Sequence, residues 1–148
     1  MTDTIVIPCP ACDRLNRLPA DRRREEAKCG ACGEALFQGR PLALTARRFD
    51  RHANAKDLPL VVDFWAPWCG PCRAMAPTYE AAARELEPAV RLAKVDTDAE
   101  PALAARFRIQ AIPTLVLIKG GNVCARQSGA ATGPALRRWI EAELARAA

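Results

Sequence analysis

The stretch LVVDFWAPWCGPCRAMAP, residues 60–77, decides how this chain folds. Its apolar beginning predicts a buried strand over residues 60–66, and the pattern after Cys69 predicts a helix over about 70–86. Cys69 and Cys72 therefore stand at a strand-to-helix junction, which is a typical setting for a redox dithiol. Unpaired backbone N–H groups and the positive end of the helix dipole stabilise a thiolate at Cys69. Because Cys72 can reach that sulfur, we expect Cys69 to attack a disulfide and Cys72 to resolve it.

The chain after residue 41 alternates between strand and helix patterns. We expect strands over 42–44, 90–96, 114–119 and 122–128, and helices over 100–107, over 132–146 and from Thr45 as N-cap to about Lys56. This order predicts an α/β fold in which helices cover both faces of a mixed sheet. The helix over 70–86 has an apolar stripe that we expect to face the core, formed by Met75, Tyr79, Ala82, Ala83 and Leu86.

The segment around Cys69 resembles the active-site segment of thioredoxins. The resemblance continues through Lys94, Ile112-Pro113-Thr114, Gly121 and Gly129, and it covers roughly residues 41–148. The first 40 residues carry four further cysteines, and they are similar to the extension of zinc-containing thioredoxins, the thioredoxin 2 type. The resemblance implies a thioredoxin fold. We expect a zinc-ribbon-like domain over residues 1–36, a linker over 37–41 and a thioredoxin domain over 42–148.

The four N-terminal cysteines have the spacing of a metal site. Cys9 and Cys12 form one Cys-x-x-Cys pair, and Cys29 and Cys32 form another after sixteen intervening residues. Two such turns, here called knuckles, supply four thiolates to a structural Zn²⁺ and leave no coordination position for water. The alternatives are a pair of redox disulfides or an iron centre of similar spacing. Residues 1–36 hold little apolar material, so we expect the metal to stabilise them.

Asp63 interrupts the apolar strand that leads into the dithiol. Burial of a carboxylate raises its pKa, so this group could exchange a proton near neutrality. The resemblance implies that Asp63 acts through water as a general base toward Cys72, and that Lys94 lies close to it. The alternatives are a carboxylate satisfied by local hydrogen bonds and an ordinary exposed lysine at a strand end.

The resemblance also implies a substrate-binding surface around the dithiol. Sequence alone favours a trans bond before Pro113, whereas in thioredoxins the matching proline is cis and leaves the backbone of the preceding residue, here Ile112, to pair with substrate. Trp68 and Gly129 match residues of the apolar rim, although they are also typical of a surface aromatic and a turn. Gly70 and Pro71 resemble the pair between the cysteines of reducing family members.

Composition excludes some classes of function. Among 148 residues there are 22 Lys and Arg against 17 Asp and Glu, a net charge of +5 with no basic tail. The run Arg22-Arg23-Arg24 is followed by two glutamates, which favours a solvated surface over nucleic-acid binding. No apolar segment approaches the roughly 20 residues of a membrane span. The beginning of the chain does not resemble a secretory signal, and the cysteine pattern fits a reducing cytoplasm.

These observations predict a protein-disulfide reductase. No dinucleotide-binding loop is present in the sequence, so we expect no organic cofactor, and the resemblance implies that an NADPH-dependent thioredoxin reductase supplies the electrons. We expect a monomer that acts on disulfide-containing proteins. Two alternatives remain: a redox-sensing or chaperone-like protein that releases zinc on oxidation, and a zinc-ribbon adaptor. His52, on a polar helix, is predicted to be a surface residue, and Cys124 a small residue in a strand.

Overall fold

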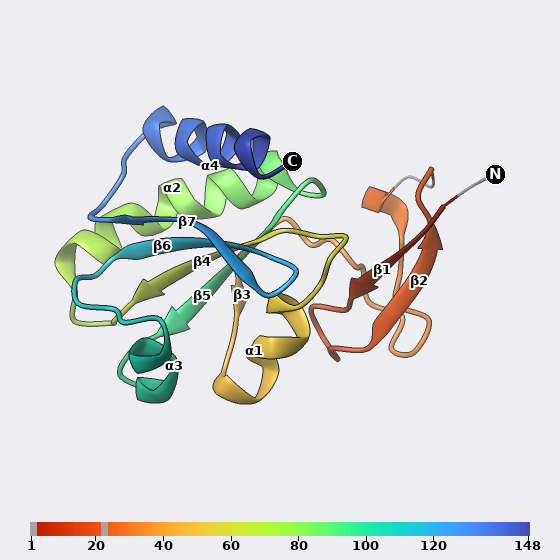
Figure 1. The fold of residues 1–148 in the computed structure, drawn as a ribbon, viewed down its shortest axis with the longest axis horizontal. Coiled ribbons are helices and arrows are strands. Elements are labelled where there is room, and N and C mark those ends of the chain that lie inside the picture. The colour runs from red at the N-terminus through yellow and green to blue at the C-terminus, as the bar shows by residue number, and fades with distance from the viewer. Residues whose placement is uncertain (1–2, 22–23) are drawn as a thin grey trace.

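The computed structural model describes residues 3–21 and 24–148. Its larger part is a five-stranded sheet in the order β3–β5–β4–β6–β7 (Figure 1). Strands β3 (Leu42–Ala43), β5 (Arg91–Asp96) and β4 (Leu60–Trp65) are parallel to one another. Strands β6 (Thr114–Lys119) and β7 (Asn122–Ser128) are antiparallel to their neighbours. The mixed sheet confirms the predicted α/β class.

Two helices cover each face of the sheet (Figure 1). Helices α2 (Gly70–Leu86) and α4 (Pro134–Ala147) pack in one core with Val61 of β4, whereas Leu60 and Val62 belong to the opposite core with residues of α1 (Ala46–Ala53) and α3 (Pro101–Arg106). Burial on both faces explains why β4 is almost continuously apolar. Since side chains alternate along a strand, Asp63 shares the face of Val61, on the side of α2.

Helix α2 has the predicted bounds and the predicted buried stripe, formed by Met75, Tyr79, Ala82, Ala83 and Leu86. Helix α1 ends at Ala53, before the predicted end near Lys56, because the turn between β6 and β7 packs there. The N–H groups of Gly121 and Gly120 donate to the carbonyls of Ala53 (2.8 Å) and Ala55 (3.3 Å). These carbonyls are thus satisfied by a distant turn instead of by a further helical turn.

Residues 3–21 and 24–36, here called the ribbon, lie beside this α/β unit and near α1 (Figure 1). Strands β1 (Thr4–Pro8) and β2 (Leu15–Pro19) form an antiparallel hairpin, followed by the 3-10 turn η1 (Arg24–Glu26). The first two residues of the arginine run, Arg22 and Arg23, lie outside the described residues. A small apolar cluster unites side chains of the ribbon with Leu58 of the α1–β4 loop, and its largest members are Ile5, Ile7, Leu18 and Leu36.

The packing of the ribbon against α1 corrects one prediction. His52 is 2% exposed and is buried, although the sequence indicated a surface residue. Its Nε2 lies 2.8 Å from a carboxylate oxygen of Asp13 in the ribbon. The prediction was wrong because the helix was assessed as a polar helix facing solvent, whereas the ribbon covers the side that carries His52.

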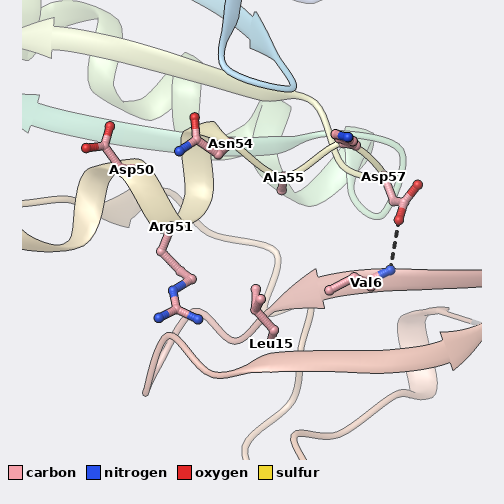
Figure 2. Close-up of a pocket in the computed structure, with 8 residues that line it drawn as sticks. Val6, Leu15, Asp50, Arg51, Asn54, Ala55 and Asp57 are labelled. Carbon is pink, nitrogen blue, oxygen red and sulfur yellow. Dashed lines mark hydrogen bonds between the residues drawn. The ribbon is translucent and has the colours of Figure 1, made fainter.

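The outer edge of β1 faces the loop that follows α1 (Figure 2). The backbone N–H of Val6 donates to the Asp57 carboxylate at 2.9 Å. A cavity of about 500 Å³ opens between the hairpin and α1, and it contains none of the predicted site residues. Its lining consists of Val6, Leu15, Asp50, Arg51, Asn54, Ala55, Lys56 and Asp57. Among the helices of the described residues, none has the length and apolar character that a membrane crossing requires.

Candidate active site and candidate metal centre

The junction of β4 and α2 brings Cys69 and Cys72 together in a disulfide bond. Cys69 occupies the N-cap position of α2, and its sulfur accepts a hydrogen bond from the N–H of Cys72 at 3.2 Å. Gly70 and Pro71 form the first helical positions, where the missing N–H of a proline costs no helical hydrogen bond. Both sulfur-bearing residues are buried, with Cys69 4% and Cys72 3% exposed.

The loop before β6 lies directly against this disulfide. The bond between Ile112 and Pro113 is cis, in agreement with the prediction. The Ile112 carbonyl oxygen is 3.8 Å from the Cys69 sulfur, and the Ile112 side chain packs on the cysteine pair. Gly129 reaches the same place from the end of β7, where its N–H donates to the Pro113 carbonyl at 2.8 Å. Its φ of +97° favours glycine at this position.

Trp68 is the most exposed feature around the dithiol. Trp68 is 69% exposed, and its indole N–H donates a hydrogen bond to the Asp98 carboxylate at 2.8 Å. A large aromatic side chain is thus exposed next to Cys69, with its polar N–H bound to Asp98. The predicted rim residues Trp68 and Gly129 are thus both found at this end of the sheet.

Asp63 is a buried carboxyl group in β4, 2% exposed. Within the described part of the chain, its Oδ1 has no hydrogen-bond partner. Burial raises the pKa of Asp63 to about 7, and the positive charge of Lys94 acts in the opposite direction. The group can therefore take up and release a proton near neutral pH, which the sequence predicted from its place in an apolar strand.

Lys94 lies opposite Asp63 in the parallel pairing of β4 and β5. It is half-buried, and its amine stands 4.2 Å from the centre of the Trp65 ring. The structure thus places Lys94 beside the carboxyl group and against an aromatic face. This is not the setting of an ordinary exposed lysine.

The four N-terminal cysteines converge on one point. All four sulfurs lie within 4.8 Å of one another, and separations of 3.6 Å join Cys9 to Cys32 and Cys12 to Cys29. A tetrahedral zinc site with Zn–S bonds of about 2.3 Å needs sulfurs spaced by roughly 3.8 Å. The donor set and its spacing therefore fit Zn²⁺.

Backbone N–H groups surround the sulfurs of both knuckles. Cys9 accepts from the N–H groups of Ala11 (3.3 Å) and Cys12 (3.5 Å), and Cys29 accepts from Ala31 (3.4 Å). A backbone hydrogen bond from Cys32 and a side-chain hydrogen bond from Asn16 are the main causes that lower the pKa of the Cys29 thiol to about 6. Such contacts favour the thiolate form of Cys29, which is the form that a metal requires, whereas burial and the neighbouring thiols raise the pKa of Cys32 to about 12.

Comparison with known proteins identifies the family. The family model described as Thioredoxin matches residues 40–142, and one described as Thioredoxin 2, N-terminal, matches residues 8–34. Thioredoxin C-3 of Corynebacterium nephridii is 39% identical over 140 residues, which cover 95% of this chain and 96% of that relative. The chain belongs to the thioredoxin family. It is therefore a thiol-disulfide oxidoreductase.

Other thioredoxins are similar over a shorter length. Thioredoxin 1 of Nostoc sp. is 39% identical over 101 residues, covering 68% of this chain and 94% of the relative. The thioredoxin of Haemophilus influenzae is 44% identical over 84 residues, covering 57% of this chain and 78% of the relative. The match to the relative from Corynebacterium nephridii therefore covers a larger share of this chain than the matches to these two thioredoxins.

In this thioredoxin the sequence did not reveal how the ribbon contacts the α/β unit. Arg48 of α1 and Arg91 of β5 each hydrogen-bond to ribbon carbonyls, and neither was predicted as a site residue. Arg91 stands at the beginning of a strand, where a charged residue is usually exposed, so the pattern gave no sign of a buried partner. A weak signal was available at Asp13, because it follows Cys12 at the position that Gly33 occupies after Cys32.

Proposed function

We propose that this thioredoxin is a protein-disulfide reductase in which Cys69 attacks and Cys72 resolves. In the reduced protein, the Cys69 thiolate attacks one sulfur of a substrate disulfide, forms a mixed disulfide and releases the other sulfur as a thiolate. The Cys72 thiolate then attacks the Cys69 sulfur, which releases the second substrate thiolate and leaves the Cys69–Cys72 disulfide. The observation that carries this proposal is the pairing of the two sulfurs at the beginning of α2.

Asp63 serves in this proposal as the proton acceptor for Cys72. A thiol must lose its proton before it can attack a disulfide. A carboxylate accepts such a proton most effectively when its pKa lies near the pH at which the reaction takes place. The burial of Asp63, its unpaired oxygen and its raised pKa support this role. Its place on the α2 face of β4 allows transfer through water.

The substrate binds in this proposal across the exposed end of the dithiol. An extended peptide pairs with the main chain of Ile112, beside the cis Pro113, while Trp68, Gly70, Pro71 and Gly129 form the surface around Cys69. Support comes from the contact between the Ile112 carbonyl and the Cys69 sulfur and from the exposure of Trp68. The substrates are proteins that carry accessible disulfides.

The N-terminal cysteines hold a structural Zn²⁺ in this proposal. Cys9, Cys12, Cys29 and Cys32 supply four thiolates, so the metal closes the ribbon and leaves no position for a reacting water. Residues 1–36 then form a zinc-binding domain, joined by residues 37–41 to the thioredoxin domain of residues 42–148. The convergence of the sulfurs supports this assignment.

Electrons reach the dithiol from another protein in this proposal. A monomer in a reducing cytoplasm accepts two electrons from an NADPH-dependent thioredoxin reductase and passes them to the substrate disulfide. Support comes from the family membership, since thioredoxins work in this way with such reductases. Nucleic acid and membranes have no part in the reaction.

The decisive experiment is reduction of insulin disulfides by the full chain with NADPH and a thioredoxin reductase. We expect the wild type to consume NADPH and to precipitate the insulin B chain, and Cys69→Ser to do neither. A wild type without activity in this coupled assay, at a confirmed metal content, would overturn the reductase proposal.

A second candidate function is redox sensing by the ribbon. Cys12 and Cys32 are exposed, and each lies 3.6 Å from a sulfur of the other knuckle, so an oxidant could join the knuckles by disulfides and release the metal. Treatment with hydrogen peroxide tests this function separately from insulin reduction. Zinc release, followed with a chromogenic chelator, would have to precede loss of the Cys69 thiol.

A further inference from the structure

The two knuckles of the ribbon share one pattern of backbone hydrogen bonds, and they differ in the residue that ends each turn, Asp13 in the first and Gly33 in the second. The N–H of Cys9 donates to Arg14 and that of Asp13 to Cys9, at 2.8 and 2.9 Å, and the N–H groups of Cys29 and Gly33 repeat these bonds at 2.8 and 2.9 Å. Both turns end in a left-handed residue, with φ of +67° at Asp13 and +80° at Gly33. Glycine adopts this conformation freely, whereas aspartate adopts it with some strain. The first knuckle therefore carries a side chain that its turn does not need.

The Asp13 side chain binds two residues of α1. Arg48 donates to the carboxylate from Nε, at 2.9 and 3.0 Å, and from Nη2 at 2.8 Å. The buried His52 adds a contact at 2.8 Å. Burial lowers the pKa of His52 to about 4, so its imidazole is neutral at pH 7 and donates an N–H to the carboxylate. Hydrogen bonds from Arg48 and His52 outweigh burial and lower the pKa of Asp13.

The carbonyl groups of Pro8 and Pro10, the residues on either side of Cys9, also accept hydrogen bonds from arginines of the α/β unit. Arg48 donates to the Pro10 carbonyl at 2.7 Å, and Arg91 donates to the Pro8 carbonyl at 2.6 Å. Arg91 also donates to the carbonyl of Leu36, where the ribbon ends. It is 2% exposed, and burial lowers its pKa to about 10, so it stays protonated at neutral pH. Two guanidinium groups thus hold the first knuckle from α1 and from β5.

The second knuckle has no comparable support. Within the described residues, the hydrogen bonds of residues 29–33 go to the ribbon itself, including the bond from the Gly30 N–H to the Asn16 side chain at 2.9 Å. A Cβ added at Gly33 would meet no atom within 4 Å. The second knuckle is thus tied to the rest of the chain by the burial of Cys29 in the apolar cluster with Leu58, and no hydrogen bond among the described residues joins it to the α/β unit.

We propose that Asp13, Arg48 and Arg91 are positioning residues of the metal site, which hold the first knuckle in its metal-binding geometry whether or not the metal is present. The second knuckle closes over the metal and opens when the metal leaves. This inference rests on the proposed zinc site. A preorganised half-site raises metal affinity because its ordering cost is met by contacts that persist without the metal, and the guanidinium charges near Cys9 offset the negative charge of four thiolates.

The sharpest test exchanges the two knuckle residues in the full chain. Asp13→Gly removes the contacts to Arg48 and His52 and relieves the left-handed strain, and Gly33→Asp, the matched control, adds the same side chain to the unsupported knuckle. Zn²⁺ affinity is measured by competition with a chromogenic chelator under reducing conditions. We expect Asp13→Gly to weaken binding by about 10- to 100-fold and Gly33→Asp to weaken it by less. If Asp13 only shaped the turn, the Asp13→Gly variant would bind Zn²⁺ at least as tightly as the wild type, and this result would overturn the proposal.

Amide hydrogen exchange of the metal-free chain supplies a second readout. The amides of Cys9 and Asp13 should exchange at least about 10-fold more slowly than the matched amides of Cys29 and Gly33, because only the first knuckle is held. Arg91→Met should remove this difference, and Arg138→Met, on the exposed side of α4, should leave it unchanged. Equal exchange from both knuckles of the metal-free wild type would contradict the proposal. A wild type that binds neither Zn²⁺ nor Co²⁺ would instead refute the zinc site itself.

Discussion

The dithiol and the metal site use the same Cys-x-x-Cys spacing and arrange their sulfurs in opposite ways. At the dithiol, Cys69 and Cys72 of one motif are joined to each other. In the ribbon, the sulfurs of both motifs gather in one cluster, in which sulfurs of different motifs approach to 3.6 Å, as between Cys9 and Cys32. In both places the N–H of the second cysteine points to the first sulfur, at 3.2 Å for Cys72 and 3.5 Å for Cys12. The local motif is therefore similar, and the difference arises after it.

The backbone after the second cysteine separates the two outcomes. After Cys72 the chain continues in α2, which keeps both sulfurs at one helix end beside Ile112. After Cys12 and after Cys32 the chain reverses through a left-handed residue, which turns each pair of sulfurs toward the other knuckle. A Cys-x-x-Cys motif thus predicts a dithiol when a helical pattern follows and a metal knuckle when a turn residue follows.

The largest expected effect is confined to the dithiol. Cys69→Ser should reduce insulin reduction to the uncatalysed background, because the attacking thiolate is lost while the fold is kept. Cys124→Ser is the matched control, since Cys124 is an exposed strand residue in β7, away from both sulfur clusters. Residual catalysis by Cys69→Ser would mean that ribbon thiols can replace the dithiol, and the two sites would not be functionally distinct.

The next effect separates the two thiols of the dithiol. Cys72→Ser should accumulate a mixed disulfide between Cys69 and substrate proteins, because attack survives and resolution is lost. Mass spectrometry of the trapped adducts under non-reducing conditions identifies the cysteine involved. Adducts on Cys72 in a Cys69→Ser protein would reverse the assigned roles.

Metal removal should affect only the ribbon. A structural zinc site of this kind contributes on the order of 10 kcal/mol to the folding of the segment that binds it. Chelation under reducing conditions should therefore increase hydrogen exchange within residues 3–36, beginning at residues 29–33, and leave the strands of the five-stranded sheet protected. Loss of protection in β4 and β6 at the same time would show that the α/β unit does not fold independently of the metal.

The smallest effect is a change of stability with pH. Because the pKa of Asp63 is raised from its ordinary value of 3.8 to about 7 in the folded protein, the folded state loses stability as the pH rises from 3.8 to about 7, and the loss is complete above about 7. Asp63→Asn cannot ionise, so it should be more stable than the wild type at pH 8, by about 4 kcal/mol, and the gain should shrink toward pH 5. Urea unfolding at both pH values measures this difference. The variant should also resolve mixed disulfides more slowly near neutral pH.

The sequence predicted the dithiol end of the molecule well because its determinants are local. The bounds of α2 and the burial of Asp63 follow from periodicity within a short segment, and in the ribbon the cluster of four cysteines follows from their spacing. The end of α1 was misplaced because Gly121, far along the chain, packs against it. Gly121 has a φ of +84°, and a Cβ there would lie 2.8 Å from the Asn54 Oδ1, so this turn favours glycine.

The contacts between the ribbon and the α/β unit were not predicted. His52, Arg48 and Arg91 are polar residues at positions that normally face water, and only the docked ribbon makes them buried or bound. Periodicity describes which face of a helix or strand is apolar, but it contains no information about which polar residues another segment will cover. The cis bond between Glu87 and Pro88 was not predicted either, because no local sequence pattern indicated it.

The hydrogen bond from Val6 to Asp57 also makes the outer edge of β1 a poor template for aggregation. Groups at residues 4, 6 and 8 face away from β2, because backbone direction alternates along a strand. The Val6 N–H is occupied by Asp57, and Pro8 has none to offer, so an approaching strand finds a donor only at Thr4. An edge with so few free donors resists pairing with other chains. A ribbon transplanted onto another protein would need the loop that carries Asp57 to remain protected in this way.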